Sequence, residues 1–172
     1  ELLVGKVLGR ATVLAGSLAA GTVAAAIVLL FRYESFAAGR YLSFVGLSFG
    51  YGLTFVAVAT GLSMALSSSR RVIGAAFGAY VLLVMLWSQI VDAVVVILFR
   101  FRASALADPP TWAELAKFAT PRTTYTYVAA ETLDVGRVPA AVADGSQWFA
   151  SPAVAIAVLA GWVLLPLTAG YL

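Results

Sequence analysis

Asp92 is the residue with the clearest chemical potential, because it is the one ionisable side chain within a long apolar stretch. Ser88 and Gln89 precede it by four and three residues, so the three side chains share one face of a helix. A carboxylate at the centre of a membrane helix costs about 2.5–3.5 kcal/mol and must face other helices or a wet cavity. Three interpretations are open: a hydrogen-bonded clamp between helices, the wall of a translocation path, or a site that holds a proton or cation.

Missing residue types exclude most other chemistry. The chain has no Cys and no His, which excludes disulfides, thiol nucleophiles, zinc sites built on these residues, haem ligation by His and catalysis by an imidazole. The sequence also lacks a Gly-x4-Gly-Lys-Ser/Thr motif, so the chain does not itself hold ATP in a phosphate-binding loop. We therefore expect no catalytic residue, cofactor or metal site on this chain.

The composition places the apolar stretch around Asp92 in a membrane. Of the 172 residues, 62% are hydrophobic and 11% are charged, and the mean hydropathy is +0.98. A soluble domain is about 45–50% apolar and about 25% charged. The net charge of +3 is spread along the chain, and no basic run is longer than Arg70-Arg71. A nucleic-acid surface is therefore not indicated.

Four charge-poor stretches are long enough to cross a bilayer, which takes about 20 apolar residues. They are 11–31, 41–66, 72–99 and 152–172. Their apolar runs are continuous and do not alternate with period two, so they predict helices rather than barrel strands. The expected fold is all-α: a single transmembrane domain over 1–172, built as a polytopic bundle of four membrane helices.

The connection 100–151 is long for a compact protein, so we expect it to have structure of its own. Thr111 and Glu114 fit a capping box at the start of a short helix, and Pro121 is expected to end that helix. A second helix is expected over about 123–133. We expect both helices to be amphipathic and to lie at, or dip into, the outer membrane interface.

Small residues recur at the spacing with which membrane helices pack closely. This spacing predicts packing faces and no chemistry. The residues are Gly5 and Gly9; Gly16, Ala20 and Ala24; Gly46 and Gly50; and Gly74 and Gly78.

Four spans put both ends of the chain on one side of the membrane, together with the short connection 67–71. The positive-inside rule does not decide which side this is, because each side carries four basic residues. On the side of the chain ends these are Lys6, Arg10, Arg70 and Arg71, and on the opposite side they are Arg32, Arg40, Arg100 and Arg102. The segment 1–10 is either a helix-end anchor with snorkelling basic side chains or a docking element for a partner.

The order of these features resembles the permease subunit of type 2 ATP-binding-cassette (ABC) exporters, in the six-helix form of prokaryotes. The likeness lies in the segment 1–10 that leads into a span, the turn 67–71 before a long span, and the helical loop before the last span. The stretch 119–125 is similar to the family's Asn-Pro-x-x-x-Tyr-like stretch, with Thr120 where Asn is usual.

The resemblance implies that the four spans are helices three to six of the permease and that the loop 100–151 is the external connection between the last two. It also implies that the segment 1–10 is the tail of a coupling helix that docks on an ATPase. Both ends of this fragment then lie in the cytoplasm, and the protein lies in the plasma membrane as a multi-pass subunit.

The implied function is export of an unidentified substrate by alternating access. The implied partners are a separate ATPase subunit, which holds ATP and Mg, a second permease copy in a homodimer or heterodimer, and the lipid bilayer. Candidates for the translocation path are Ser88, Gln89 and Asp92. Candidates for coupling to the ATPase are Glu1, Lys6, Arg10, Arg70 and Arg71.

Two other classes of function stay open. An ion-coupled secondary transporter with Asp92 as its proton site predicts transport into vesicles without nucleotide. A membrane scaffold that transports nothing predicts that deletion of 111–144 abolishes partner binding without changing any flux.

Overall fold

The structure of the chain, a computed structural model, describes residues 2–32, 37–102, 104–134, 138 and 147–171. Within these ranges every regular element is a helix, and none is a strand. The expected all-α fold is confirmed.

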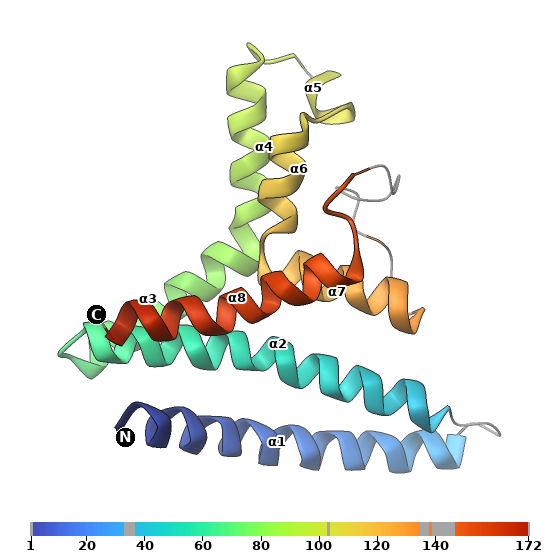
Figure 1. The fold of residues 1–172 in the computed structure, drawn as a ribbon. Coiled ribbons are helices and arrows are strands. Elements are labelled where there is room, and N and C mark those ends of the chain that lie inside the picture. Colours follow the sequence, from blue (N-terminus) through green and yellow to red (C-terminus); the bar gives the residue numbers. More distant parts are fainter. Residues whose placement is uncertain (1, 33–36, 103, 135–137, 139–146, 172) are drawn as a thin grey trace.

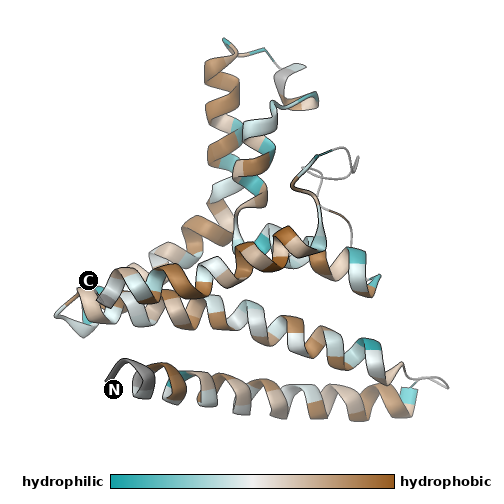
Figure 2. Cartoon of the chain, in the orientation of Figure 1, coloured by the Kyte–Doolittle hydropathy of each residue, from teal (hydrophilic) through white to brown (hydrophobic). Residues whose placement is uncertain are grey.

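Four helical stretches in the described part of the chain are long and apolar enough to cross a bilayer, as expected. Figure 2 shows their hydrophobic residues in brown. The first helix begins well before residue 11, because Lys and Arg are good helix formers and do not end a helix. The four stretches are α1 (Leu2–Arg32), α2 (Ala38–Ala65), the continuous run of α3 (Ser69–Tyr80), η1 (Val81–Leu86) and α4 (Trp87–Leu98), and α8 (Pro152–Tyr171).

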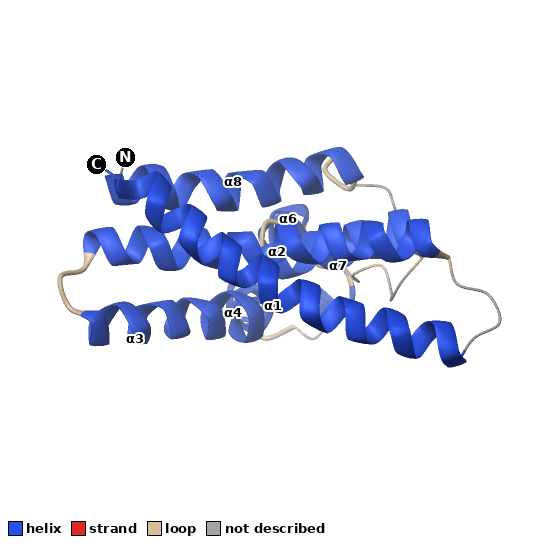
Figure 3. Cartoon of the chain, turned by 90° about the horizontal axis from the view of Figure 1, so that it is seen from below, coloured by secondary structure: helices blue, strands red, loops and turns tan. Residues whose placement is uncertain are grey.

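Helix α2 is the common partner of the bundle, because it packs against α1, α3, α7 (Pro121–Leu133) and α8. The start of α1, the end of α8 and the connection 66–68 between α2 and α3 lie at one end of the bundle (Figures 1 and 3). We call this end the short-loop end.

Glycine lets α2 and α8 approach closely. A Cβ on Gly61 of α2 would lie 2.3 Å from the carbonyl oxygen of Pro166 in α8, and a Cβ on Gly170 would lie 2.8 Å from the Cα of Gly61. A Cβ on any glycine of the spacing pattern described above would meet nothing within 4 Å. The glycines that allow this close approach therefore lie outside that pattern.

The third span is bent at η1, a π-helical turn over Val81–Leu86. On one side of it α3 runs along α2, and on the other side α4 leaves the layer of α1, α2 and α8 at a steep angle (Figures 1 and 3). A π-helical turn disturbs the regular pattern of helical hydrogen bonds and is a recognised cause of helix bending. The sequence predicted one uninterrupted span, because all six residues of η1 are apolar.

The loop before the last span is helical, as expected, with α5 (Ser104–Ala107), α6 (Thr111–Phe118) and α7. The predicted capping box is wrong. Pro110 is the residue that precedes α6, and no side chain caps the helix. Glu114 instead accepts a hydrogen bond from Gln147, 2.6 Å away.

The boundary between the two loop helices also differs from the prediction. Helix α6 ends at Phe118, and Pro121 begins α7, where a missing N–H costs no helical hydrogen bond. The hydroxyl of Thr120 accepts a hydrogen bond from the backbone N–H of Thr123 at 3.3 Å and caps α7. The stretch 135–139, with its Gly and Pro, also predicts a break after this helix, and all of it except Val138 lies outside the described residues.

A buried apolar cluster joins the loop to the last span. Phe118, Tyr127 and Phe149 form its aromatic part, in which the ring of Phe118 lies 5.4 Å from each of the other two rings. Val128 of α7 and Ala155 of α8 complete the cluster. The loop helices are thus packed onto the beginning of α8.

Candidate functional site

Asp92 forms an ion pair with Lys117. Helices α4 and α6 lie side by side (Figure 1), and the Nζ of Lys117 is 2.5 Å from an Oδ1 of Asp92. The side chain of Lys117 is 18% exposed and that of Asp92 is 41% exposed. No other ion pair occurs within the described ranges. The charge that the sequence places in the third span therefore has a specific cationic partner.

The rest of the interface between α4 and α6 is apolar, apart from one hydrogen bond. Val91 and Val95 of α4 are buried against Ala113 of α6. The indole Nε1 of Trp87 donates to the backbone carbonyl of Ala116 at 2.8 Å. This set of contacts is what a clamp between two helices requires.

Ser88 and Gln89 lie on the same helix, but their side chains are exposed. Neither residue makes a side-chain hydrogen bond to the α6 residues that hold Asp92 in the described structure. Of the three residues that the spacing singles out, Asp92 is therefore paired within the chain, whereas the side chains of Ser88 and Gln89 are exposed on the surface of the chain.

Arg122 connects α7 to the bend of the third span, a contact between distant residues that no sequence pattern predicts. Its Nη1 donates to the backbone carbonyl oxygen of Val84, in η1, at 2.7 Å. A guanidinium is well suited to a carbonyl in a disturbed helical turn, because it carries several N–H donors and stays charged.

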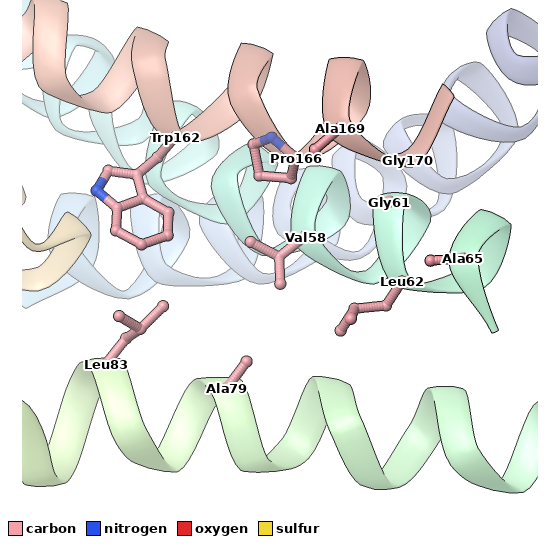
Figure 4. A pocket seen from close by; sticks show the side chains of 10 residues that line it. All are labelled: Val58, Gly61, Leu62, Ala65, Ala79, Leu83, Trp162, Pro166, Ala169 and Gly170. Carbon is pink, nitrogen blue, oxygen red and sulfur yellow. The ribbon is translucent and has the colours of Figure 1, made fainter. Parts of the chain in front are cut away.

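An apolar cavity of about 290 Å³ lies between α2, the bent span and α8 (Figure 4). Val58 and Leu62 line it from α2, Leu83 from η1, and Trp162 and Pro166 from α8. The Nε1 of Trp162 donates to the carbonyl oxygen of Ala119, between α6 and α7, at 2.7 Å. The lining residues include no acid or base, so the cavity suits an apolar occupant.

The candidate coupling residues lie at or near the short-loop end. Arg70 and Arg71 are exposed in the first turn of α3. Arg10 turns toward α2, where its Nη1 donates to the hydroxyl of Thr60 at 2.9 Å. Glu1 lies outside the described residues, as does the side chain of Lys6.

A comparison with family models decides what kind of protein carries this arrangement. The model described as ABC-2 family transporter protein matches residues 1–172. The chain belongs to this family. No curated protein and no solved structure matches it.

Membership of the ABC-2 transporter family confirms the resemblance seen in the sequence. With four membrane-length helices, the chain is a multi-pass membrane component of a transporter and is not itself the catalytic part. At the α4–α6 interface of this family member, Asp92 is paired with a cation, as a carboxylate within a membrane helix is expected to be.

Proposed function

We propose that the chain is the permease subunit of an ATP-driven exporter. It works as a pair of permease copies with a separate ATPase, which binds ATP and Mg²⁺, and it moves an unidentified substrate by alternating access. The observation that carries this proposal is the family match over all 172 residues. The absence of a phosphate-binding loop motif agrees with an ATPase on another chain.

The short-loop end is the side that we assign to the cytoplasm and to the ATPase. Arg70 and Arg71 support this, because they are exposed side by side at the start of α3 and are free to meet acidic groups of a partner. Glu1 and Lys6, at the start of the chain, belong to the same proposed docking surface. Arg10 differs from them because its guanidinium is engaged with α2.

The path for substrate is proposed along the exposed polar side chains of α4. Ser88 and Gln89 are exposed, and α4 stands away from α2 and α8, so this face is open to a second copy. Asp92 lies on the same face and contributes an oxygen, while Lys117 balances its charge. Because the ammonium of Lys117 neutralises it, the carboxylate of Asp92 can border the path without leaving an unpaired charge in the membrane.

The bend at η1 is where we propose that α4 changes direction during the cycle. Rocking of a helix bundle needs an element with two arrangements, and a π-helical turn is a weak point in a long helix. Arg122 holds this turn from outside the third span.

The test is assembly with an ATPase. The full-length protein is expressed together with the product of its neighbouring gene, which we expect to be an ATPase, and co-purification and ATP turnover are measured after reconstitution. We expect the pair Arg70→Glu and Arg71→Glu to lose at least tenfold of the coupled turnover. The matched control is Arg32→Glu with Arg40→Glu, which makes the same charge change at the other end of the bundle.

If no ATPase co-purifies, or if both double variants lose turnover equally, the proposed assignment fails. Transport into vesicles without nucleotide would instead favour the ion-coupled alternative that uses Asp92.

A further inference from the structure

A second cavity, unlike the apolar one, lies at the short-loop end between α1 and the connection from α2 to α3. Its volume is about 310 Å³. Arg10, Ser63, Ser67 and Ser69 supply its polar groups, and its apolar lining includes Leu66 and Ile73. The Ser63 hydroxyl already donates to the carbonyl of Thr60 at 2.8 Å, so the hydrogen-bond donors left in the cavity are the guanidinium of Arg10 and the hydroxyls of Ser67 and Ser69.

The guanidinium of Arg10 is held in place and is only partly used. One of its nitrogens donates to the Thr60 hydroxyl, which is buried and itself donates to the carbonyl of Val56 at 2.7 Å. The ion pair within the described residues belongs to Lys117 and Asp92, so no described carboxylate neutralises Arg10. The remaining N–H groups of Arg10 are available to an anion.

The cavity lies at the ends of candidate membrane spans, where a membrane helix is expected to meet lipid headgroups. Arg10 is about one turn inside the candidate span Val7–Arg32, and the connection at Ser67 separates the spans Ala38–Ala65 and Ser69–Leu98. Arg70 and Arg71 follow directly and are exposed. Basic residues at this level attract anionic lipids, with about 1 kcal/mol for each side chain near the surface.

We propose that this cavity binds a phosphate group, that of an anionic membrane lipid whose acyl chains lie along α1 and α3. Arginine suits a phosphate because its planar fork can donate two parallel hydrogen bonds, and the hydroxyls of Ser67 and Ser69 add further donors. A water takes about 30 Å³ of liquid volume, so 310 Å³ has room for a phosphodiester headgroup and bridging waters. This inference needs a membrane-embedded chain but does not depend on the proposed export.

The experiment compares lipid retention on the full-length protein in detergent by native mass spectrometry. Phosphatidylglycerol and phosphatidylcholine with the same acyl chains are added separately. We expect the protein to retain more phosphatidylglycerol, and Arg10→Gln to lower that preference about fivefold, which corresponds to one basic contact. Arg32→Gln removes the same charge from the other end of α1 and is expected to change nothing.

A second pair of variants leaves Arg10 and its bond to Thr60 in place. Ser67→Asp puts a carboxylate into the cavity, where it competes with the phosphate for Arg10. Ser68→Asp puts the same charge on the next residue, which does not line the cavity. We expect loss of the lipid preference for Ser67→Asp only, and this comparison decides the matter if Arg10→Gln does not fold.

The ligand could be the phosphate of a lipid headgroup or a free phosphate ion, and inorganic phosphate is the probe that distinguishes these two sources. If millimolar phosphate displaces the lipid from the wild type, and binds less well to Arg10→Gln, the same site serves a free anion. Equal retention of the two lipids by the wild type would overturn the proposal. An equal loss of preference in Arg10→Gln and Arg32→Gln would overturn it as well.

Discussion

At the scale of single residues, the contact between Asp92 and Lys117 explains how a carboxylate is kept in an apolar helix. The two residues are 25 positions apart, and α6 brings the ammonium to α4. Removal of one member of such a pair leaves the other as an unbalanced charge, which costs more than the pair contributes. The partly exposed position of Asp92 makes this cost moderate.

The first prediction concerns this pair. Lys117→Met is expected to lower the thermal stability of the purified protein, by about 1 kcal/mol in free energy of unfolding, because Asp92 is left without its cation. The double variant Asp92→Asn with Lys117→Met is expected to recover most of the loss, since it removes both charges. If the double variant loses as much stability as Lys117→Met and Asp92→Asn lose separately, added together, the two side chains do not interact.

The second prediction concerns the contact between α2 and α8. Gly61→Ala is expected to cost about 1–3 kcal/mol, because its Cβ would lie 2.3 Å from the carbonyl oxygen of Pro166. Gly50→Ala, in the same helix, meets no atom within 4 Å and is expected to be neutral or to stabilise by up to about 1 kcal/mol. Thermal unfolding in detergent compares them, and equal destabilisation would refute the close contact.

At the scale of elements, the stability of α7 depends on hydrogen-bond partners for the backbone N–H groups of its first turn. Thr120 is buried and accepts a hydrogen bond from the backbone N–H of Thr123, while Pro121 occupies the next position. The capping residue of a helix contributes about 1 kcal/mol, and Asn serves as well as Thr. The presence of Thr where the type 2 permeases usually have Asn is therefore a conservative difference.

The third prediction follows from this cap. Thr120→Ala is expected to lower stability by about 1 kcal/mol, and Thr120→Asn to preserve it. Thr111→Ala is the control, because Thr111 does not cap α6. A larger effect of Thr111→Ala than of Thr120→Ala in thermal unfolding would restore the capping box that the sequence predicted.

The fourth prediction concerns the bend. Arg122→Gln removes the hydrogen bond to Val84, which contributes about 1 kcal/mol. We expect backbone amides of η1 to exchange with deuterium about fivefold faster, while Arg102→Gln, the control, leaves them unchanged. Unchanged exchange in Arg122→Gln would mean that this contact does not hold the turn.

Hydropathy predicts elements better than it predicts their contacts. The four long helices follow from apolar runs, because membrane helices satisfy their own backbone hydrogen bonds. The bend does not follow, because Val81–Leu86 is as apolar as its neighbours and a π turn depends on packing. The partners of Asp92 and of Gly61 do not follow either, because each lies on a helix distant in sequence.

At the scale of the whole molecule, the main neighbour of α1 among the described helices is α2. None of the membrane window of α1 is buried within the described chain. Most of its surface therefore meets lipid or another helix, which is compatible with the proposed pairing of two permease copies.

The fifth prediction concerns orientation. The 172 residues contain no Cys, so a thiol introduced among them has no competing thiol within this segment. In intact cells, a membrane-impermeant maleimide is expected to label Ser104→Cys, in α5, and to label Ser68→Cys, at the short-loop end, only after permeabilisation. The reverse pattern would place the short-loop end outside and remove the proposed docking surface for an ATPase.

The hydrogen bond between Trp162 and Ala119 has a consequence for motion. The corner between α6 and α7 is tied to α8 by this bond and to η1 by Arg122, while α6 is tied to α4 through Lys117. These ties link α4 to the last span through the corner, so a swing of α4 that keeps the ion pair must either carry the last span with it or break the indole bond. The chain has four tryptophans, so a variant that keeps Trp162 and replaces the other three with Phe would report the swing through its fluorescence.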